Sequence, residues 1–153
     1  MKLEDSVTLP CGRETAWAAL NDPEILRQCI PGCEELTQDA PDHMTAKVTL
    51  KVGPVKARFA GEVTLSEINA PESYVLSGEG KGGVAGFAKG SAHVRLEDAG
   101  PNETVLHYSA SADVGGKLAQ IGSRLLDATA QKLARQFFDK FRDTVADDEA
   151  ADA

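Results

Sequence analysis

Residues 117–144 read KLAQIGSRLLDATAQKLARQFFDKFRDT, and this stretch decides the fold. It contains no proline and a single glycine, and its large apolar residues recur at the spacing of one helix face, at Leu118, Ile121, Leu125, Leu126, Leu133, Phe137 and Phe141. The pattern predicts one continuous helix from Lys117 to about Thr144. At 1.5 Å per residue such a helix is roughly 40 Å long, which is enough to cross a whole small domain.

The segment before this helix, residues 33–114, alternates apolar and polar residues with the period of two that is typical of strands. Turn-forming residues such as Gly53-Pro54 interrupt it and divide it into six predicted strands. Apolar residues keep one parity from Ala46 to Val52 and again from Val55 to Leu65, which indicates an antiparallel hairpin with one face towards the core.

The N-terminal part predicts a further strand over residues 2–9 and short helices over 14–20 and 24–29. Asp22 is placed to cap the second of these helices and Pro23 to begin it. The resulting class is α+β with a helix-grip architecture, in which a curved seven-stranded antiparallel sheet wraps around the long C-terminal helix and two short helices lie between strands 1 and 2. We expect one domain over residues 1–145 and a disordered acidic tail over residues 146–153.

Charge and composition exclude some classes of function. The 153 residues include 16 Lys and Arg against 24 Asp and Glu, so the formal net charge of −8 repels phosphate polyanions and excludes nucleic acid as a partner. The first residues lack the basic and apolar regions of a signal peptide, and no stretch is apolar for long enough to span a membrane. We therefore expect a cytoplasmic protein whose three cysteines are free thiols.

Small residues occupy many inward positions, namely Ala46, Ala57, Gly61, Gly78, Gly80, Ala92, Ala110 and Ala112 on the strands and Gly122 and Thr129 on the helix. Two interpretations are equally open: the helix lies closer to the sheet and fills the space, or the space is a ligand cavity. In the second case the predicted walls are Trp17, Leu26, Leu50, Val52, Phe59, Leu76, Phe87, Leu118, Ile121, Gly122 and Leu125. Such walls suit a lipid-like or isoprenoid ligand.

No motif predicts catalytic or metal-binding residues. Gly78–Gly83 has the spacing G-x-G-x-x-G, but the segment after it lacks a helical pattern, so we interpret it as a glycine-rich turn at the mouth of the cavity. Cys29 and Cys33 lack the second ligand pair of a zinc site. No serine or cysteine stands beside a base that could activate it as a nucleophile.

Two distinctive blocks, CIPGCE at residues 29–34 and GKLAQIGSR at residues 116–124, occur with Trp17, Asp22-Pro23, the segment 52–55, the segment 59–61 and the glycines Gly80, Gly86 and Gly90. With these motifs the chain resembles the carbon monoxide dehydrogenase G-subunit family over residues 1–145. That family belongs to the START-like superfamily, also called SRPBCC or polyketide-cyclase-related, whose fold is the helix grip. The resemblance brings no catalytic residues.

The resemblance implies an accessory protein of a carbon monoxide dehydrogenase-type molybdenum hydroxylase that holds a quinone or isoprenoid lipid without a covalent bond. Many members carry an apolar membrane-binding end where this sequence has the acidic residues 146–153, so we expect at most peripheral contact with the inner face of the membrane. Two alternatives stay open. One is an assembly or docking factor for that enzyme with no ligand, and the other is a START-like cyclase or hydrolase.

Overall fold

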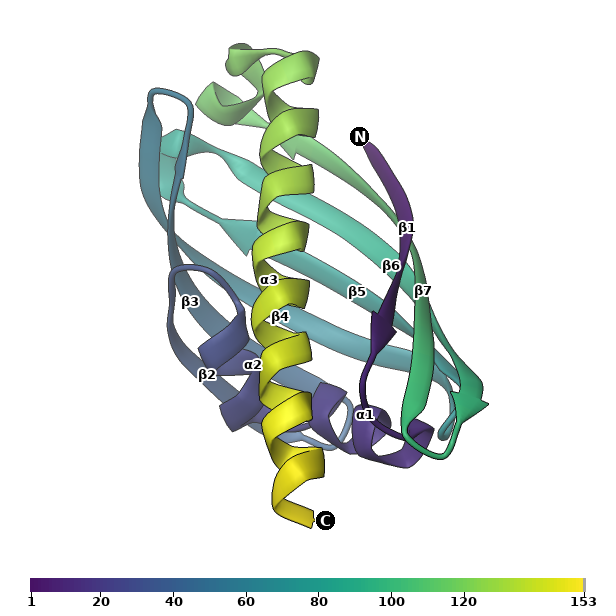
Figure 1. Cartoon of the computed structure of the whole chain (residues 1–153). Coiled ribbons are helices and arrows are strands. Elements are labelled where there is room, and N and C mark those ends of the chain that lie inside the picture. Colours follow the sequence, from purple (N-terminus) through teal and green to yellow (C-terminus); the bar gives the residue numbers. More distant parts are fainter. Residues whose placement is uncertain (153) are drawn as a thin grey trace.

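A seven-stranded antiparallel sheet with the order β1-β7-β6-β5-β4-β3-β2 forms the body of the protein. The computed structural model describes the backbone of residues 1–152 and the side chains of residues 1–146. The strands are β1 (Lys2–Leu9), β2 (Cys33–Ala40), β3 (His43–Val52), β4 (Val55–Asn69), β5 (Ser73–Lys81), β6 (Phe87–Gly100) and β7 (Glu103–Gly115). The sheet curves around the long helix α3 (Ser123–Asp152), as Figure 1 shows. The predicted helix-grip architecture is confirmed.

The β3–β4 hairpin shows how the alternating pattern sets the register. Ala46 lies opposite Gly61 and Leu50 lies opposite Ala57, while Gly53 makes the turn with a φ of +58° that glycine adopts readily. Because side chains alternate between the two faces of a strand, these pairs all belong to the inner face of the sheet, as their parity predicts.

The first strand pairs with the last one, with Leu9 opposite Thr104. Two short helices, α1 (Arg13–Leu20) and α2 (Pro23–Cys29), then carry the chain from this edge of the sheet to the opposite edge, where β2 begins. The Asp22 carboxylate accepts a hydrogen bond of 3.0 Å from the backbone N–H of Glu24 and so caps α2, as predicted. Both helices lie at one end of the sheet in Figure 1.

The C-terminal helix begins later than its apolar pattern predicts. Residues Gly116–Ile121 form a separate 3₁₀ turn, η2, and α3 starts at Ser123. Gly122 between them has a φ of +94°, a left-handed conformation that ends the turn and redirects the chain. The prediction of one continuous helix from Lys117 is therefore wrong. The expectation of a disordered tail over residues 146–153 falls almost wholly outside the described side chains and stays a prediction.

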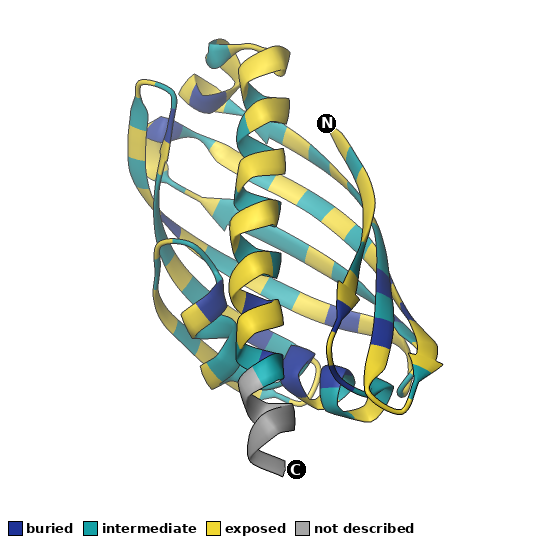
Figure 2. Cartoon of the chain, viewed as in Figure 1, coloured by how far each residue is buried: buried dark blue, intermediate teal, exposed yellow. Residues whose placement is uncertain are grey.

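Two apolar clusters hold the ends of the molecule together. The larger one joins α1, α2 and the later turns of α3 to the adjoining strands, with Leu9, Leu106, Phe141 and Val145 fully or almost fully buried. The smaller one packs Leu118 of η2 against Val52 and Phe59 near the β3–β4 turn, together with Ala85 of the 3₁₀ turn η1 (Gly83–Ala85). In Figure 2 the buried residues gather towards these two ends, and the strands behind the middle of α3 are mostly intermediate or exposed.

Candidate ligand-binding cavity

An apolar cavity lies between α3 and the middle of the sheet. It has two lobes, an α2 lobe of about 510 Å³ lined by residues that include Leu26 and Phe138, and an η2 lobe of about 420 Å³ lined by residues that include Leu118. The lobes adjoin, because Ala46, Val63, Gly78, Gly80 and Ala88 line both. Each volume lies within the range of roughly 300–1,000 Å³ that is usual for small-molecule sites.

The cavity stays open because α3 is anchored at its ends. Phe141, which is 0% exposed, and Val145 lock its later turns into the larger cluster, while Leu118 and Leu126 tie η2 and the first turns of α3 to the smaller one. Between these anchors the helix would have to kink in order to reach the sheet, and residues 123–146 contain no proline or glycine that would favour a kink.

Small side chains make up the wall of the sheet between the two anchors. The inward residues that line the lobes include Ala46, Gly61, Gly78, Gly80, Ala92, Ala110 and Ala112, and Thr129 lines the η2 lobe from α3. Ala57 instead packs against the smaller cluster. Of the two interpretations, a closely packed helix or a cavity, the structure shows the cavity. Small residues on the sheet do not bring α3 closer, because contacts at both ends of the helix fix its distance from the sheet.

The side chains that point into the cavity are almost entirely apolar. The Thr129 hydroxyl donates a hydrogen bond of 2.8 Å to the carbonyl of Leu125 and is thereby satisfied within its own helix. Glu79 and Lys89 border the cavity but stand at outward positions of their strands, opposite one another in the register. Charged groups therefore face the outer surface of the sheet, and the wall offers little beyond dispersion and apolar contact.

Several predicted wall residues line the cavity. Leu26 and Leu76 line the α2 lobe, and Leu50, Val52, Phe59 and Leu118 line the η2 lobe. They come from α2, β3, β4, β5 and η2, which the fold brings to one space.

Other predicted wall residues, namely Trp17, Phe87, Ile121, Gly122 and Leu125, are not among those that line the two lobes. The Trp17 ring packs edge-on against the Tyr74 ring, with 5.2 Å between the ring centroids, and belongs to the rim of the larger cluster. Phe87 is 44% exposed and covers Gly115, and Ile121 packs into the smaller cluster. Gly122 and Leu125 sit where the chain turns into α3. The turn at Gly122 moves Leu125 out of phase with η2, so that its side chain lies 40% exposed over Gly53.

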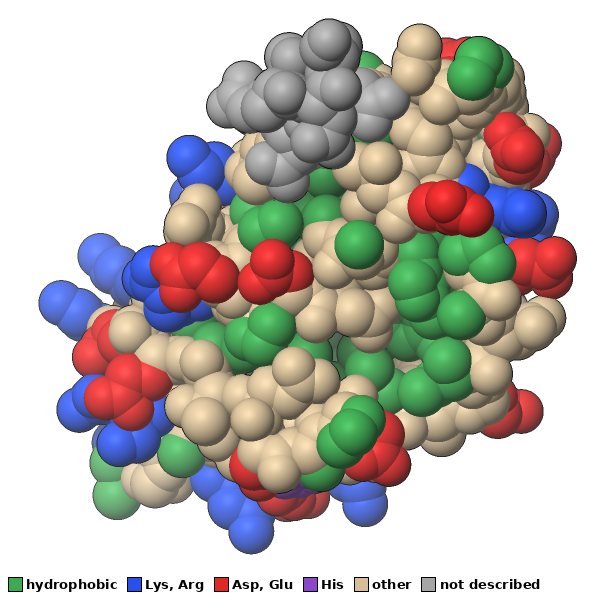
Figure 3. Space-filling view, turned by 90° about the horizontal axis from the view of Figure 1, so that it is seen from below, with side chains coloured by type: hydrophobic (Ala, Val, Ile, Leu, Met, Phe, Trp, Pro, Cys, Tyr) green, Lys and Arg blue, Asp and Glu red, His purple; other side chains and the backbone are tan. Residues whose placement is uncertain are grey.

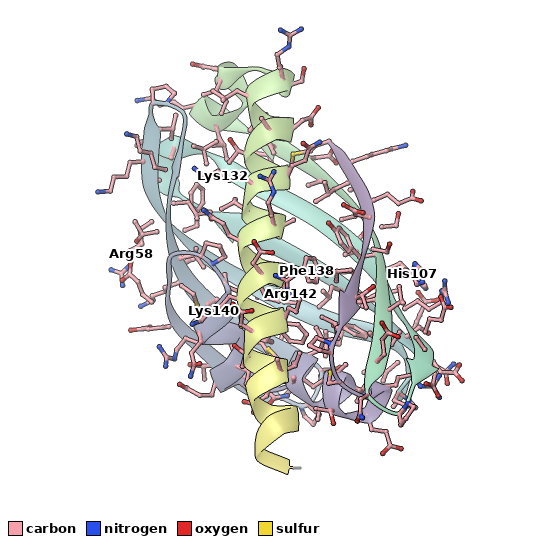
Figure 4. The ribbon with its side chains drawn as sticks, viewed as in Figure 1. Arg58, His107, Lys132, Phe138, Lys140 and Arg142 are labelled. Atoms are coloured by element: carbon pink, nitrogen blue, oxygen red, sulfur yellow. The ribbon has the colours of Figure 1, made fainter. Side chains whose placement is uncertain are left out.

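Further lining residues, which the sequence pattern did not predict, lie directly after α2 and on β2, β3 and α3. They include Ile30, Leu36, Met44, Leu133, Phe137 and Phe138. Phe138 reaches from α3 towards β7, where its ring stacks on Tyr108 at 4.9 Å (Figure 4). The spacing of Leu126, Ala130, Leu133 and Phe137 could have revealed the inward face of α3, had Leu125 not been assigned to the same face.

The other motifs do not build a reactive site in the described part of the chain. After Gly78–Lys81 the chain enters η1 and then β6, so no helix N-terminus receives a phosphate there. The cysteines are free thiols, and burial raises the pKa of both Cys29 and Cys33, which keeps them protonated. Among residues 1–146 no group of His, Cys, Asp and Glu could hold a metal ion.

Seen from the end that carries α1 and α2, hydrophobic side chains gather in the middle of the surface and charged side chains surround them (Figure 3). A curved antiparallel sheet that grips one long helix over an apolar cavity is the arrangement of the START-like proteins. The family model for CoxG, the G subunit of carbon monoxide dehydrogenase, matches residues 6–146, and the chain belongs to that family.

Solved structures share the whole fold. A conserved protein from Geobacillus kaustophilus is 33% identical over 96% of each chain, with a TM-score of 0.90. A START superfamily protein from Mycobacterium smegmatis, 14% identical over 95% of this chain and 97% of its own, has a TM-score of 0.73. The Zhui aromatase/cyclase from Streptomyces sp. R1128, which is 12% identical over 95% of this chain and 93% of its own, has a TM-score of 0.71. No curated protein matches the chain.

Proposed function

We propose that this protein is a non-enzymatic carrier that holds a neutral hydrophobic molecule, a quinone or another isoprenoid lipid, in the cavity under α3. The observation that carries the proposal is the pair of adjoining lobes with small residues at their junction and apolar side chains along their walls. An apolar space of this size gains free energy when it exchanges water for an apolar ligand.

The chemistry of the wall favours binding over catalysis. General acid–base catalysis needs a titratable group within hydrogen-bond reach of the substrate. The carboxylates near the cavity, Glu62 and Glu79, stand on the outward parity of β4 and β5. The cyclase among the structural relatives shares the fold, and this similarity by itself says nothing about activity here.

Membership of the CoxG family supports the partner that we propose, a molybdenum hydroxylase of the carbon monoxide dehydrogenase type. The carrier would deliver its ligand to this enzyme or collect it from there. A role in assembly or docking of the same enzyme, without a ligand, is the alternative, and it predicts that binding of the enzyme survives when the cavity is filled by mutation.

We further propose a cytoplasmic location with peripheral contact to the inner face of the membrane. None of the helices in the described part of the chain is long and apolar enough to cross a bilayer. Val84, which is 85% exposed, lies at the same end as Phe87 and Leu125, because η1 packs beside η2 and Leu125 covers the β3–β4 turn. Exposed lysines at this end, among them Lys51 and Lys117, suit an anionic lipid surface.

Extraction tests the carrier proposal. The protein is purified without detergent, and native mass spectrometry and solvent extraction then look for a bound lipid. Titration with a decyl-substituted benzoquinone measures binding directly. The proposal predicts a bound lipid or saturable binding of one quinone per chain. Absence of both overturns it. Capture of the hydroxylase by a protein that binds neither would favour the assembly role.

A further inference from the structure

Tyr74 stands out in the cavity because its side chain is buried and yet carries a polar group that no other described residue binds. It lies on β5, is 4% exposed and lines the α2 lobe. Its ring is held by the edge-on contact with Trp17 and by the surrounding larger cluster. The position of the hydroxyl is therefore determined by packing.

The Tyr74 hydroxyl has no hydrogen-bond partner among the described residues. In the same part of the chain, every buried side-chain oxygen or nitrogen that is sealed from solvent has a hydrogen-bond partner. Among the described residues the Tyr74 hydroxyl is thus unpaired but not sealed from solvent, and Tyr74 lines the α2 lobe of the cavity. A buried tyrosine usually satisfies its hydroxyl, so a ligand is the partner that this site lacks.

Two further features define what the hydroxyl can bind. Burial raises its pKa, so it stays protonated at every physiological pH and can donate a hydrogen bond. Lys89 borders the α2 lobe but stands at an outward position opposite Glu79. Its positive charge is therefore not available inside the lobe to pair with the carboxylate of a ligand. An ionised fatty acid would lose its hydration there with little compensation.

We infer that Tyr74 is a specificity residue of the cavity, and that it donates a hydrogen bond to one neutral oxygen acceptor, such as a quinone carbonyl, at one end of a largely hydrocarbon ligand. This inference rests on the proposed carrier function and adds an orientation. The oxygen-bearing end lies in the α2 lobe against Tyr74, and the hydrocarbon end extends past Gly80 into the η2 lobe.

A pair of probes of similar size separates the hydrogen bond from apolar contact. Butyrophenone carries a carbonyl, and butylbenzene has a methylene group in its place. Isothermal titration calorimetry measures both with the unchanged protein and with Tyr74→Phe. We expect the substitution to weaken butyrophenone binding about five- to tenfold, as loss of one buried hydrogen bond does, and to leave butylbenzene binding within twofold. Tyr108→Phe, which alters the other tyrosine, is the matched control and should change neither.

The outcomes distinguish this inference from the proposed function. If neither probe, nor the quinone, binds the unchanged protein, the carrier function fails. If both probes bind and Tyr74→Phe weakens them equally or not at all, the carrier function stands and the role of Tyr74 is overturned. Thermal unfolding of Tyr74→Phe guards against a folding defect. Because the hydroxyl has no partner among residues 1–146, the melting temperature of Tyr74→Phe should equal or exceed that of the unchanged protein.

Discussion

A Cβ atom added at Gly80 of β5 would lie 4.0 Å from the Cβ atom of Phe59 on β4 and would meet no other described atom so closely. Gly80 lines both lobes, so this pair marks the junction through which a long ligand must pass. A side chain at Gly80 would grow into open space and not into the backbone. The relationship makes Gly80 the place at which the cavity can be divided by a single substitution.

Gly80→Leu should weaken binding of the decyl-substituted benzoquinone at least tenfold, because the leucine side chain occupies the space between the lobes through which a long ligand must pass. Its effect on the free energy of unfolding should stay below the roughly 1–3 kcal/mol of an overpacked core, since the site is open. Calorimetry and urea unfolding measure the two quantities. Leu125→Trp is the control, because it enlarges a side chain that does not line either lobe, and it should leave the binding affinity unchanged. Equal losses of affinity in both variants would contradict the assigned position of the cavity.

Phe141→Ala should lower the free energy of unfolding by about 3–5 kcal/mol, because Phe141 is fully buried and anchors α3 in the larger cluster. Urea unfolding followed by circular dichroism provides the measurement. Leu125→Ala removes a large apolar side chain that is partly exposed and should cost much less. A small effect of Phe141→Ala would mean that α3 is not anchored at this end.

Gly122→Ala should lower the free energy of unfolding by about 1–2 kcal/mol, since alanine pays this cost in the left-handed conformation that separates η2 from α3. No described atom lies close enough to clash with the added Cβ, so the cost comes from the backbone alone. Gly80→Ala, at a glycine without a positive φ, is the control and should be nearly neutral. An unchanged stability of Gly122→Ala would show that η2 and α3 can join into one helix.

His43 should titrate above its ordinary pKa of 6.5. Its Nδ1 lies 2.6 Å from a carboxylate oxygen of Asp39, and this hydrogen bond, with the negative charges of Asp39 and Glu62, stabilises the imidazolium. Because the pKa is raised in the folded protein, the stabilisation is complete below the unfolded pKa and disappears as the pH rises through the folded one.

The melting temperature should therefore decline slightly as the pH rises from about 6 through the folded pKa of His43, and this decline should be smaller in His43→Gln. NMR titration of the imidazole measures the pKa directly. In Asp39→Asn the pKa should return towards 6.5. A titration of His43 at or below 6.5 in the unchanged protein would refute the ion pair.

Local pattern was sufficient for most of the architecture. The parity of Ala46 to Leu65 depends only on which side of a pleated strand each residue occupies, and it predicted the β3–β4 hairpin and its inner face. Asp22 and Pro23 likewise predicted the start of α2, because capping is a contact between neighbours in the chain. The small inward residues were also identifiable, since their positions follow from the same alternation.

The sequence by itself determined the helix grip and the apolar, small-residue character of its interior, because periodicity and residue size are local properties. Only the tertiary structure decided that the interior is open. The cavity depends on Phe141 and Leu118 packing into separate clusters at opposite ends of the molecule. These are contacts between segments far apart in the sequence, which local periodicity does not predict. The turn at Gly122 likewise left Leu125 40% exposed, and Trp17 came to pack against Tyr74, through contacts between segments far apart in the chain.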